Sequence, residues 1–171
     1  MLKSRKIRQS LATLCVTFCA AVSAAALSSS VPSGWGEDFA AAKKSAAASG
    51  KYVLLAFSGS DWCPWCVRME KDIYGVKSFV KEAKKDFELV MIDMPNDQSI
   101  LSPLAKTQNR ELVEKYGIRG FPCSVLVRPN GEEVTRFPGY RRGGPEAFLK
   151  DLKEAAAGAG KPKKDGAAAG K

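Results

Sequence analysis

Two apolar runs in the chain predict strands that are buried on both faces. Residues 52–58 (YVLLAFS) and 87–93 (FELVMID) are apolar along most of their length and include β-branched and aromatic side chains. Between them, from Pro64 to Ala83, apolar residues recur at helical spacing, with a break just before Gly75. Strand, helix and strand in this order require a right-handed crossover, so the two strands should be parallel.

The remaining pattern predicts three more helices and a hairpin. An Ala-rich stretch over residues 37–50 favours a helix, and residues 108–117 favour a short helix that a glycine ends. Residues 123–137 predict a hairpin, because two strand-like segments flank a Pro-Asn-Gly turn. Residues 145–156 predict a closing amphipathic helix, and residues 94–107 form a connection long enough to have a function of its own. We therefore expect an α/β fold with a central mixed sheet of about four strands flanked by helices.

The beginning of the chain has the order of a secretory signal peptide. Basic residues without an acid (Lys3, Arg5, Lys6 and Arg8) precede a run of apolar or small residues at positions 11–27. Residues 1–24 are therefore expected to be a signal peptide, cleaved after Ala24 or, as a near alternative, after Ala26. An uncleaved membrane anchor is the other interpretation, which the Thr, Ser and Ala content disfavours.

Composition divides the rest of the chain into three parts. We expect a Pro/Gly/Ser-rich linker at residues 25–34, one domain at residues 35–154, and a disordered tail rich in Lys, Ala and Gly at residues 155–171. The net charge of +9 resides mostly in the signal segment and the tail, so the domain itself is close to neutral. Nucleic acid is not an expected partner, because proteins that bind it concentrate basic residues on the folded surface.

The cysteines and the missing histidines restrict the chemistry. Of the five cysteines, Cys15 and Cys19 lie in the signal segment, which leaves Cys63, Cys66 and Cys123 for the domain. The chain has no histidine, which excludes His-dependent catalytic triads and His-ligated zinc or haem. Three thiols are also too few for a four-ligand zinc site, so we expect no bound metal.

The stretch WCPWC is the best candidate for a reactive site. Cys63 should end the loop that follows a strand, with Pro64 at the first helical position and Cys66 one turn further on. Free N–H groups at a helix start stabilise a thiolate, which makes Cys63 the expected nucleophile. A haem attachment site needs histidine where Val67 stands, and a purely structural disulfide across so short a loop would add little stability. Redox exchange is the interpretation that remains.

Together with the segments YGIRGFPCSVLV and PNGEEVTRFPGY, this motif resembles the thioredoxin-fold proteins. The resemblance covers residues 35–154, and the lead-in Ser-Asp-Trp-Cys is similar to that of an exported, envelope group of this family. It implies a thioredoxin fold, a cis-proline at Pro122 that faces the cysteines, and Gly139 near the end of the last strand. It also implies a groove for an extended peptide, lined by Trp62, Pro64, Trp65, Phe121 and Pro122. Within this groove we expect Trp65 to contact substrate and Trp62 to serve mainly in packing.

The sequence departs from the family pattern at several positions. Thioredoxins usually carry a buried carboxylate in the strand before the cysteines, and Ala56 or Phe57 stands there; Leu89 replaces the lysine that often accompanies it. Proton transfer from the resolving thiol must then use water or a rim acid such as Asp61. Cys123 occupies a position where threonine is common, and it is either a third redox thiol or a small buried apolar residue.

These features predict an exported, periplasmic thiol-disulfide oxidoreductase that exchanges disulfides with proteins. Cys63 attacks and Cys66 resolves the mixed disulfide, so no cofactor is expected beyond the Cys63–Cys66 disulfide itself. The pair Pro64-Trp65 lacks the histidine of the oxidising members, which favours a reductant supplied with electrons by a membrane or envelope redox partner. We expect a monomer. The alternative is a non-catalytic binding or chaperone-like module that uses the same groove.

Overall fold

The computed structural model describes residues 31–162, so the expected signal peptide and most of the tail lie outside the described residues. Within this part the strands are β1 (Tyr52–Ser58), β2 (Phe87–Asp93), β3 (Cys123–Val127) and β4 (Glu133–Pro138). The helical elements are α1 (Phe39–Ser49), α2 (Pro64–Met69), the π-helical turn η1 (Glu70–Tyr74), α3 (Lys77–Ala83), the 3₁₀ turn η2 (Gln98–Ile100), α4 (Pro103–Lys115) and α5 (Gly144–Ala159).

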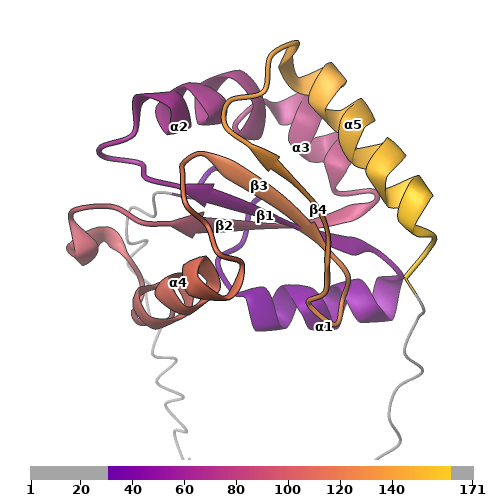
Figure 1. The fold of residues 1–171 in the computed structure, drawn as a ribbon, viewed down its shortest axis with the longest axis horizontal. Coiled ribbons are helices and arrows are strands. Elements are labelled where there is room, and N and C mark those ends of the chain that lie inside the picture. Colours follow the sequence, from indigo (N-terminus) through magenta and orange to yellow (C-terminus); the bar gives the residue numbers. More distant parts are fainter. Residues whose placement is uncertain (1–30, 163–171) are drawn as a thin grey trace, which may run out of the picture.

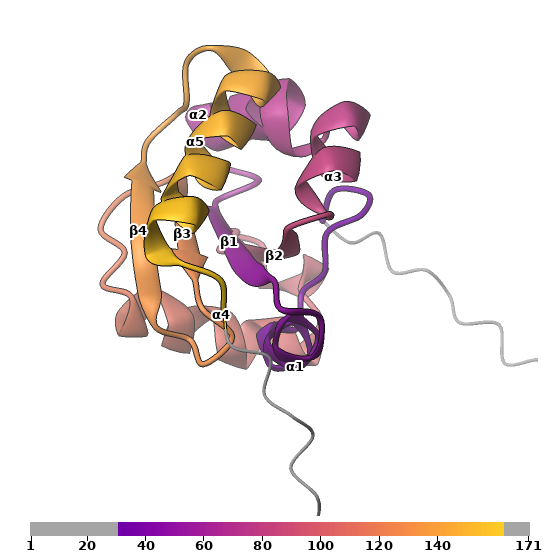
Figure 2. The ribbon, with the colours of Figure 1, turned by 90° about the vertical axis from the view of Figure 1, so that its right-hand side faces the viewer.

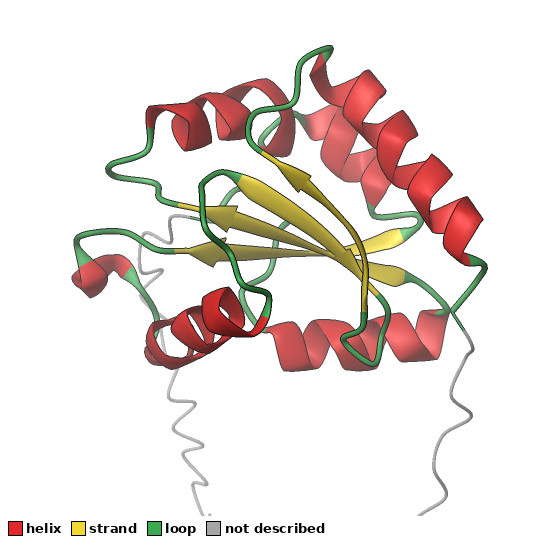
Figure 3. Ribbon diagram, viewed as in Figure 1, coloured by secondary structure: helices red, strands yellow, loops and turns green. Residues whose placement is uncertain are grey.

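The four strands form one mixed sheet in the order β2-β1-β3-β4 (Figure 3). β1 pairs in parallel with β2 and antiparallel with β3, which in turn pairs antiparallel with β4. The predicted parallel pair, hairpin and mixed four-stranded sheet are thus confirmed. All seven residues of β1 are buried, because this strand lies inside the sheet and helices cover both faces (Figure 1).

The helices divide the core into two layers, one on each face of the sheet (Figures 1 and 2). α2, α3 and α5 cover one face, and α1 and α4 cover the other. Along β1, Leu54 and Ala56 join the first layer while Leu55 and Phe57 join the second, as the alternation of side chains in a strand requires. The motif WCPWC follows β1 directly, so the sheet fixes where it begins.

The helix after the cysteines is interrupted where the sequence predicts, but it has an unexpected turn. α2 passes into η1, in which the N–H of Gly75 donates to the carbonyl of Glu70, five residues earlier, at 2.7 Å. Turns of this kind widen the helix locally and often occur at functional sites. The sequence pattern predicted the break at Gly75 and gave no signal for the wider turn.

The prediction for residues 94–107 was wrong in its boundary. The fourth helix starts at Pro103 instead of residue 108, because the Ser102 side chain accepts the N–H of Ala105 and Pro103 occupies the first turn. The connection also contains η2, where Asp97 accepts the N–H of Ser99. The part of this connection that lies outside helices is therefore shorter than expected.

Residues 155–159, which were expected to belong to the tail, are part of a helix instead. α5 continues to Ala159 because its last turns are packed on the core and their carbonyls are bound. The hydroxyl of Tyr52 donates to the carbonyls of Ala156 and Gly160, and Arg128 Nη2 donates to that of Ala159 at 2.7 Å. Beyond the helix, Pro162 is buried and lines a cavity with Tyr52 and Phe87, the first residues of β1 and β2. The end of the described chain is thus fixed at the edge of the sheet where these strands start.

Candidate active site

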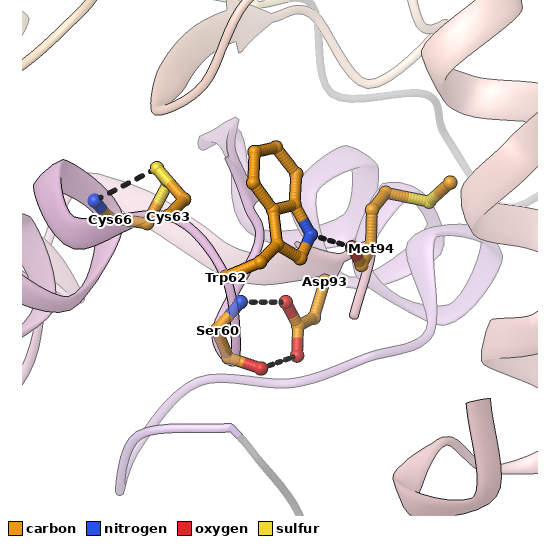
Figure 4. The surroundings of a disulfide bond; sticks show 6 residues. All are labelled: Ser60, Trp62, Cys63, Cys66, Asp93 and Met94. Atoms are coloured by element: carbon orange, nitrogen blue, oxygen red, sulfur yellow. Dashed lines mark hydrogen bonds between the residues drawn. A yellow bond between two sulfur atoms is a disulfide. The ribbon is translucent and has the colours of Figure 1, made fainter. Parts of the chain in front are cut away.

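Cys63 and Cys66 form a disulfide at the start of α2 (Figure 4). Cys63 is the N-cap residue in an extended conformation and Pro64 follows in the first turn, as predicted. The backbone N–H of Cys66 points to Cys63 Sγ at 3.2 Å. The same N–H can stabilise a thiolate on this sulfur when the disulfide opens.

The two sulfur-bearing residues differ in access to solvent. Cys63 is 6% exposed and Cys66 is 1% exposed. Both residues are buried in the oxidised protein, and Cys63 keeps the larger exposed fraction. This difference matches the expected roles of an attacking and a resolving cysteine.

The segment before β3 lies at the same edge of the sheet as the disulfide. The Phe121-Pro122 peptide bond is cis, as the family resemblance implied. Phe57 pairs with Cys123 in the register of β1 and β3, so Pro122 comes next to the end of β1. The carbonyl of Pro122 accepts the N–H of Gly139 at 2.8 Å, which ties the end of β4 to this segment.

Two half-exposed tryptophans belong to the motif, Trp62 directly before Cys63 and Trp65 directly before Cys66, and each contacts another ring. Trp62 is 44% exposed, lies edge-on to Phe121 with ring centroids 5.5 Å apart, and donates its indole N–H to the Met94 carbonyl at 2.7 Å (Figure 4). Trp65 is 53% exposed and lies 5.6 Å from the ring of Tyr140. Trp62 is thus more exposed than a packing role alone requires. Of the residues expected to line the groove, Trp62 and Phe121 are in contact, whereas Trp65 packs against Tyr140, which the sequence analysis did not single out.

Asp61 connects the active-site loop to the connection after β2. Its carboxylate accepts the N–H groups of Asn96 and Asp97, both at 2.9 Å. These hydrogen bonds, with that from Asp97 the stronger influence, lower the pKa of Asp61 below its usual range. Both oxygens of this carboxylate already accept hydrogen bonds, and its lowered pKa makes it a weaker base. It is therefore poorly suited to take a proton from Cys66, so this expected role is not supported.

Two other acids beneath the loop went unnoticed in the sequence. Asp93, the last residue of β2, is 2% exposed and accepts from the N–H of Ser60 at 2.9 Å and from its hydroxyl at 2.6 Å (Figure 4). Glu70 is half-buried, one turn after Cys66, and burial followed by the charge of Asp93 raises its pKa above the usual range. The spacing of Cys66 and Glu70, four residues on one helix, is the signal that could have identified the latter.

Replacing Glu70 with glutamine should change how stability depends on pH. Because its pKa is raised in the folded protein, Glu70 binds a proton there at pH values where the unfolded chain has already released it. Stability therefore falls as pH rises from the usual glutamate pKa to the raised one. At neutral pH the Glu70→Gln protein should be more stable than the parent by less than about 1 kcal/mol, since solvent screens this half-exposed group.

Urea unfolding at neutral pH and at about pH 3 measures the effect, and the difference between the two proteins should vanish at the lower pH. An equal difference at both values would show that Glu70 acts through packing instead of through its charge.

Cys123 is the free thiol of the described residues and is buried at 5% exposure. Its side chain lies in the core layer under α1 and α4. The helix that begins at the cysteine pair, α2, packs on the other face of the sheet, where its residue Met69 belongs to the opposite core layer. Burial raises the pKa of the Cys123 thiol above its usual range. This placement agrees with a small buried apolar residue.

We expect Cys123 of the oxidised protein to react slowly with iodoacetamide at neutral pH, and faster as pH rises towards its raised pKa. The labelled fraction is measured by mass mapping, with the same protein unfolded in urea as the fully reactive control. A disulfide from Cys123 to Cys63 or Cys66 in the map would instead favour the third redox thiol.

A metal-ligating cluster and a membrane-spanning helix are both absent from the described part of the chain. Among residues 31–162 there is no group of three or more His, Cys, Asp or Glu side chains placed to hold a metal ion. Nor does this range contain a helix of the length and apolar character needed to cross a membrane.

Comparisons with known proteins give a consistent result. The sequence model of the family described as "Thioredoxin-like domain" matches residues 39–156. The chain is 32% identical over 120 residues to the disulfide bond reductase DsbH of Chlamydia pneumoniae, covering 70% of each protein. It is 36% identical over 89 residues to the thiol:disulfide interchange protein DsbD of Pseudomonas fluorescens, which is 52% of this chain but only 14% of that protein.

Solved structures share the fold. The DsbH oxidoreductase superposes with a TM-score of 0.67 at 24% identity, covering 91% of this chain and 95% of that one. A thioredoxin from Thermus thermophilus gives a TM-score of 0.57 at 22% identity, covering 77% and 91% respectively.

Proposed function

This chain belongs to the thioredoxin-like family as a thiol-disulfide oxidoreductase, and we propose that it is an exported enzyme that reduces disulfides of protein substrates. The observation that carries the proposal is the Cys63–Cys66 disulfide, with Cys63, the more exposed of the two residues, at the start of a helix and Cys66 within its first turn. The DsbH protein that it resembles is named a disulfide bond reductase.

The reaction proceeds in two exchanges. The Cys63 thiolate of the reduced protein attacks one sulfur of the substrate disulfide, so that a mixed disulfide forms and one substrate thiolate leaves. Cys66 then loses its proton and attacks Cys63 Sγ, which releases the second substrate thiol. Two electrons have moved to the substrate and the Cys63–Cys66 disulfide is restored.

Glu70 is the group that best fits the proton transfer from Cys66. It lies one turn away on the same helix, and its raised pKa brings it closer to the working pH, which improves a carboxylate as proton acceptor. Asp93 supports this role, since its charge helps to keep the pKa of Glu70 high.

The proposal also includes the direction of electron flow, from this protein to its substrate, and the location of the protein outside the cytosol. Pro64-Trp65 lacks a histidine that would stabilise the reduced pair, which favours a reducing protein. The signal-like residues 1–24 support export. A reductant outside the cytosol must receive two electrons for each turnover, so the proposal includes an envelope redox partner that reduces Cys63–Cys66.

Reduction of insulin disulfides, followed by turbidity, tests the activity, and the redox potential of the Cys63–Cys66 pair tests the direction. We expect activity above that of the thiol reductant alone and a potential more negative than about −200 mV. A higher potential would contradict a reductant role.

The two half-exposed tryptophans also fit a binding module that works without turnover. An inactive parent protein, combined with undiminished client binding by the Cys63→Ser protein, would favour this second function.

A further inference from the structure

Four side chains form a cluster beside the disulfide: Trp65, Arg68, Asp72 and Tyr140, here called the Arg68 cluster. The Arg68 guanidinium lies over two rings, 5.6 Å from the centroid of Trp65 and 5.2 Å from that of Tyr140. Asp72 accepts from Arg68 Nε at 3.3 Å and from the Tyr140 hydroxyl at 2.7 Å. The cluster therefore joins the residue between the two cysteines to the segment that follows β4.

Arg68 is held in place and yet has unused donors. Its Nε donates to Asp72 and the guanidinium also interacts with the Tyr140 hydroxyl, which leaves most of its five N–H groups without a partner in the described range. Its side chain is 59% exposed, and the two rings and Asp72 restrict its position. A guanidinium that is already ordered loses less freedom when its remaining N–H groups bind a carboxylate, which matches their planar geometry.

Basic residues continue along the chain beyond the Arg68 cluster. After Tyr140 come Arg141, which pairs with Asp151 at 2.5 Å, and Arg142, which is exposed and has no partner in the described range. Charges near Trp62 are mixed, since Asp61 and Asp97 lie on that side together with Lys106, whose charge acts on Asp97. The unpaired Arg142 and the spare N–H groups of Arg68 therefore make the Trp65 side the one that attracts a negative group on the substrate.

We propose that the Arg68 cluster is a specificity site that binds an acidic side chain next to the reacting cysteine of the substrate. The apolar part of that substrate segment lies on the ring of Trp65, and its carboxylate binds the free N–H groups of Arg68. This proposal rests on the proposed disulfide-reductase function and adds a preference among substrates to it. Arg68 does not touch the reacting sulfur atoms, so it determines specificity and takes no part in the chemistry.

The test uses short peptides with one cysteine, whose thiol is joined to 5-thio-2-nitrobenzoate, in three versions with Glu, Gln or Lys beside that cysteine. The reduced full-length protein is mixed with each peptide in a single turnover. Cys63 attacks the peptide sulfur and the coloured thionitrobenzoate leaves; Cys66 then releases the peptide thiol and the disulfide re-forms. The rate with the Cys63→Ser protein is subtracted to remove the contribution of the other thiols.

The parent protein should react with the Glu peptide about five to ten times faster than with the Gln peptide, and more slowly still with the Lys peptide. In Arg68→Gln the preference for Glu over Gln should fall to less than about twofold. Tyr140→Phe, which keeps the ring but frees Asp72 from its hydroxyl partner, should give an intermediate preference. Raising the salt concentration should reduce the preference of the parent.

Two controls separate specificity from a general change in Cys63. Arg110→Gln removes the same charge from α4, on the other face of the sheet, and should keep the full preference. The uncharged disulfide of 4-thiopyridine should react with parent and Arg68→Gln at the same rate. If Arg68→Gln slowed this reagent as much as the Glu peptide, Arg68 would act on the Cys63 thiolate and the proposal would be wrong.

Equal rates with all three peptides in the parent would overturn the specificity site while leaving the reductase function intact. No reaction with any peptide or with insulin would instead overturn the proposed function on which it rests.

Discussion

Replacing Cys63 with serine is expected to lower the rate of insulin reduction by at least about three orders of magnitude. The serine hydroxyl is protonated at neutral pH, so the site loses its nucleophile, and Cys66 cannot replace it because it is only 1% exposed. The rate is measured as the initial increase in turbidity with a fixed concentration of thiol reductant. A protein that keeps more than about a tenth of the activity would show that another thiol, such as Cys123, carries the reaction.

Cys66→Ser is the matched control, because it removes the second step and leaves the first. This protein should form a mixed disulfide between Cys63 and the substrate and release it slowly, so that a covalent complex accumulates on a non-reducing gel. Cys63→Ser should give no such complex. Complex formation by both variants in equal amounts would contradict the division of roles between the two cysteines.

Replacing Phe148 with alanine is expected to destabilise the protein by about 3–5 kcal/mol. Phe148 is 1% exposed and packs α5 against three other aromatic rings, one each from η1, α3 and β4. Its ring stacks on Phe79 at 5.9 Å and lies edge-on to Phe137 at 5.4 Å, with Tyr74 at 6.5 Å. Alanine would remove all three contacts and leave a cavity that this close-packed layer cannot fill.

Urea unfolding of the oxidised protein, followed by circular dichroism, measures this loss. Leu149→Ala provides the comparison, since Leu149 is the neighbouring residue of α5 and is only partly buried against the same layer. Its cost should be less than half that of Phe148→Ala. Equal costs would contradict the dominant role of Phe148, because alanine favours the helix at both positions and only the lost packing differs.

The fold could be predicted from the sequence because its signals are local. β1 and β2 have the bounds that their apolar runs indicate, and α1 ends at Gly50, whose φ of 71° is the left-handed cap that glycine favours. The start of α4 at Pro103 has a local signal too, the Ser102 cap, which the apolar pattern alone did not reveal. The end of α5 depends instead on interactions with distant residues. α5 is extended by Tyr52 and Arg128, which bind its last carbonyls from elsewhere in the sequence.

The local parts of the site could also be predicted from the sequence, and the parts built from distant residues could not. The motif WCPWC can be recognised from the spacing of its cysteines and from the proline at the helix start. The family resemblance predicted the cis bond before Pro122. The buried Asp93 was missed because its partner Ser60 is 33 residues away in sequence. The Arg68 cluster was missed for the same reason, since Tyr140 reaches Asp72 across 68 residues.

The anchoring of the last described residues has a practical consequence for attaching this protein to other molecules. Pro162 lies with Tyr52 and Phe87, where β1 and β2 start, whereas the cysteines follow the opposite end of β1. A surface or fusion partner attached at Pro162 would therefore lie at the end of the sheet opposite the disulfide, which leaves the reactive sulfur open to large substrates.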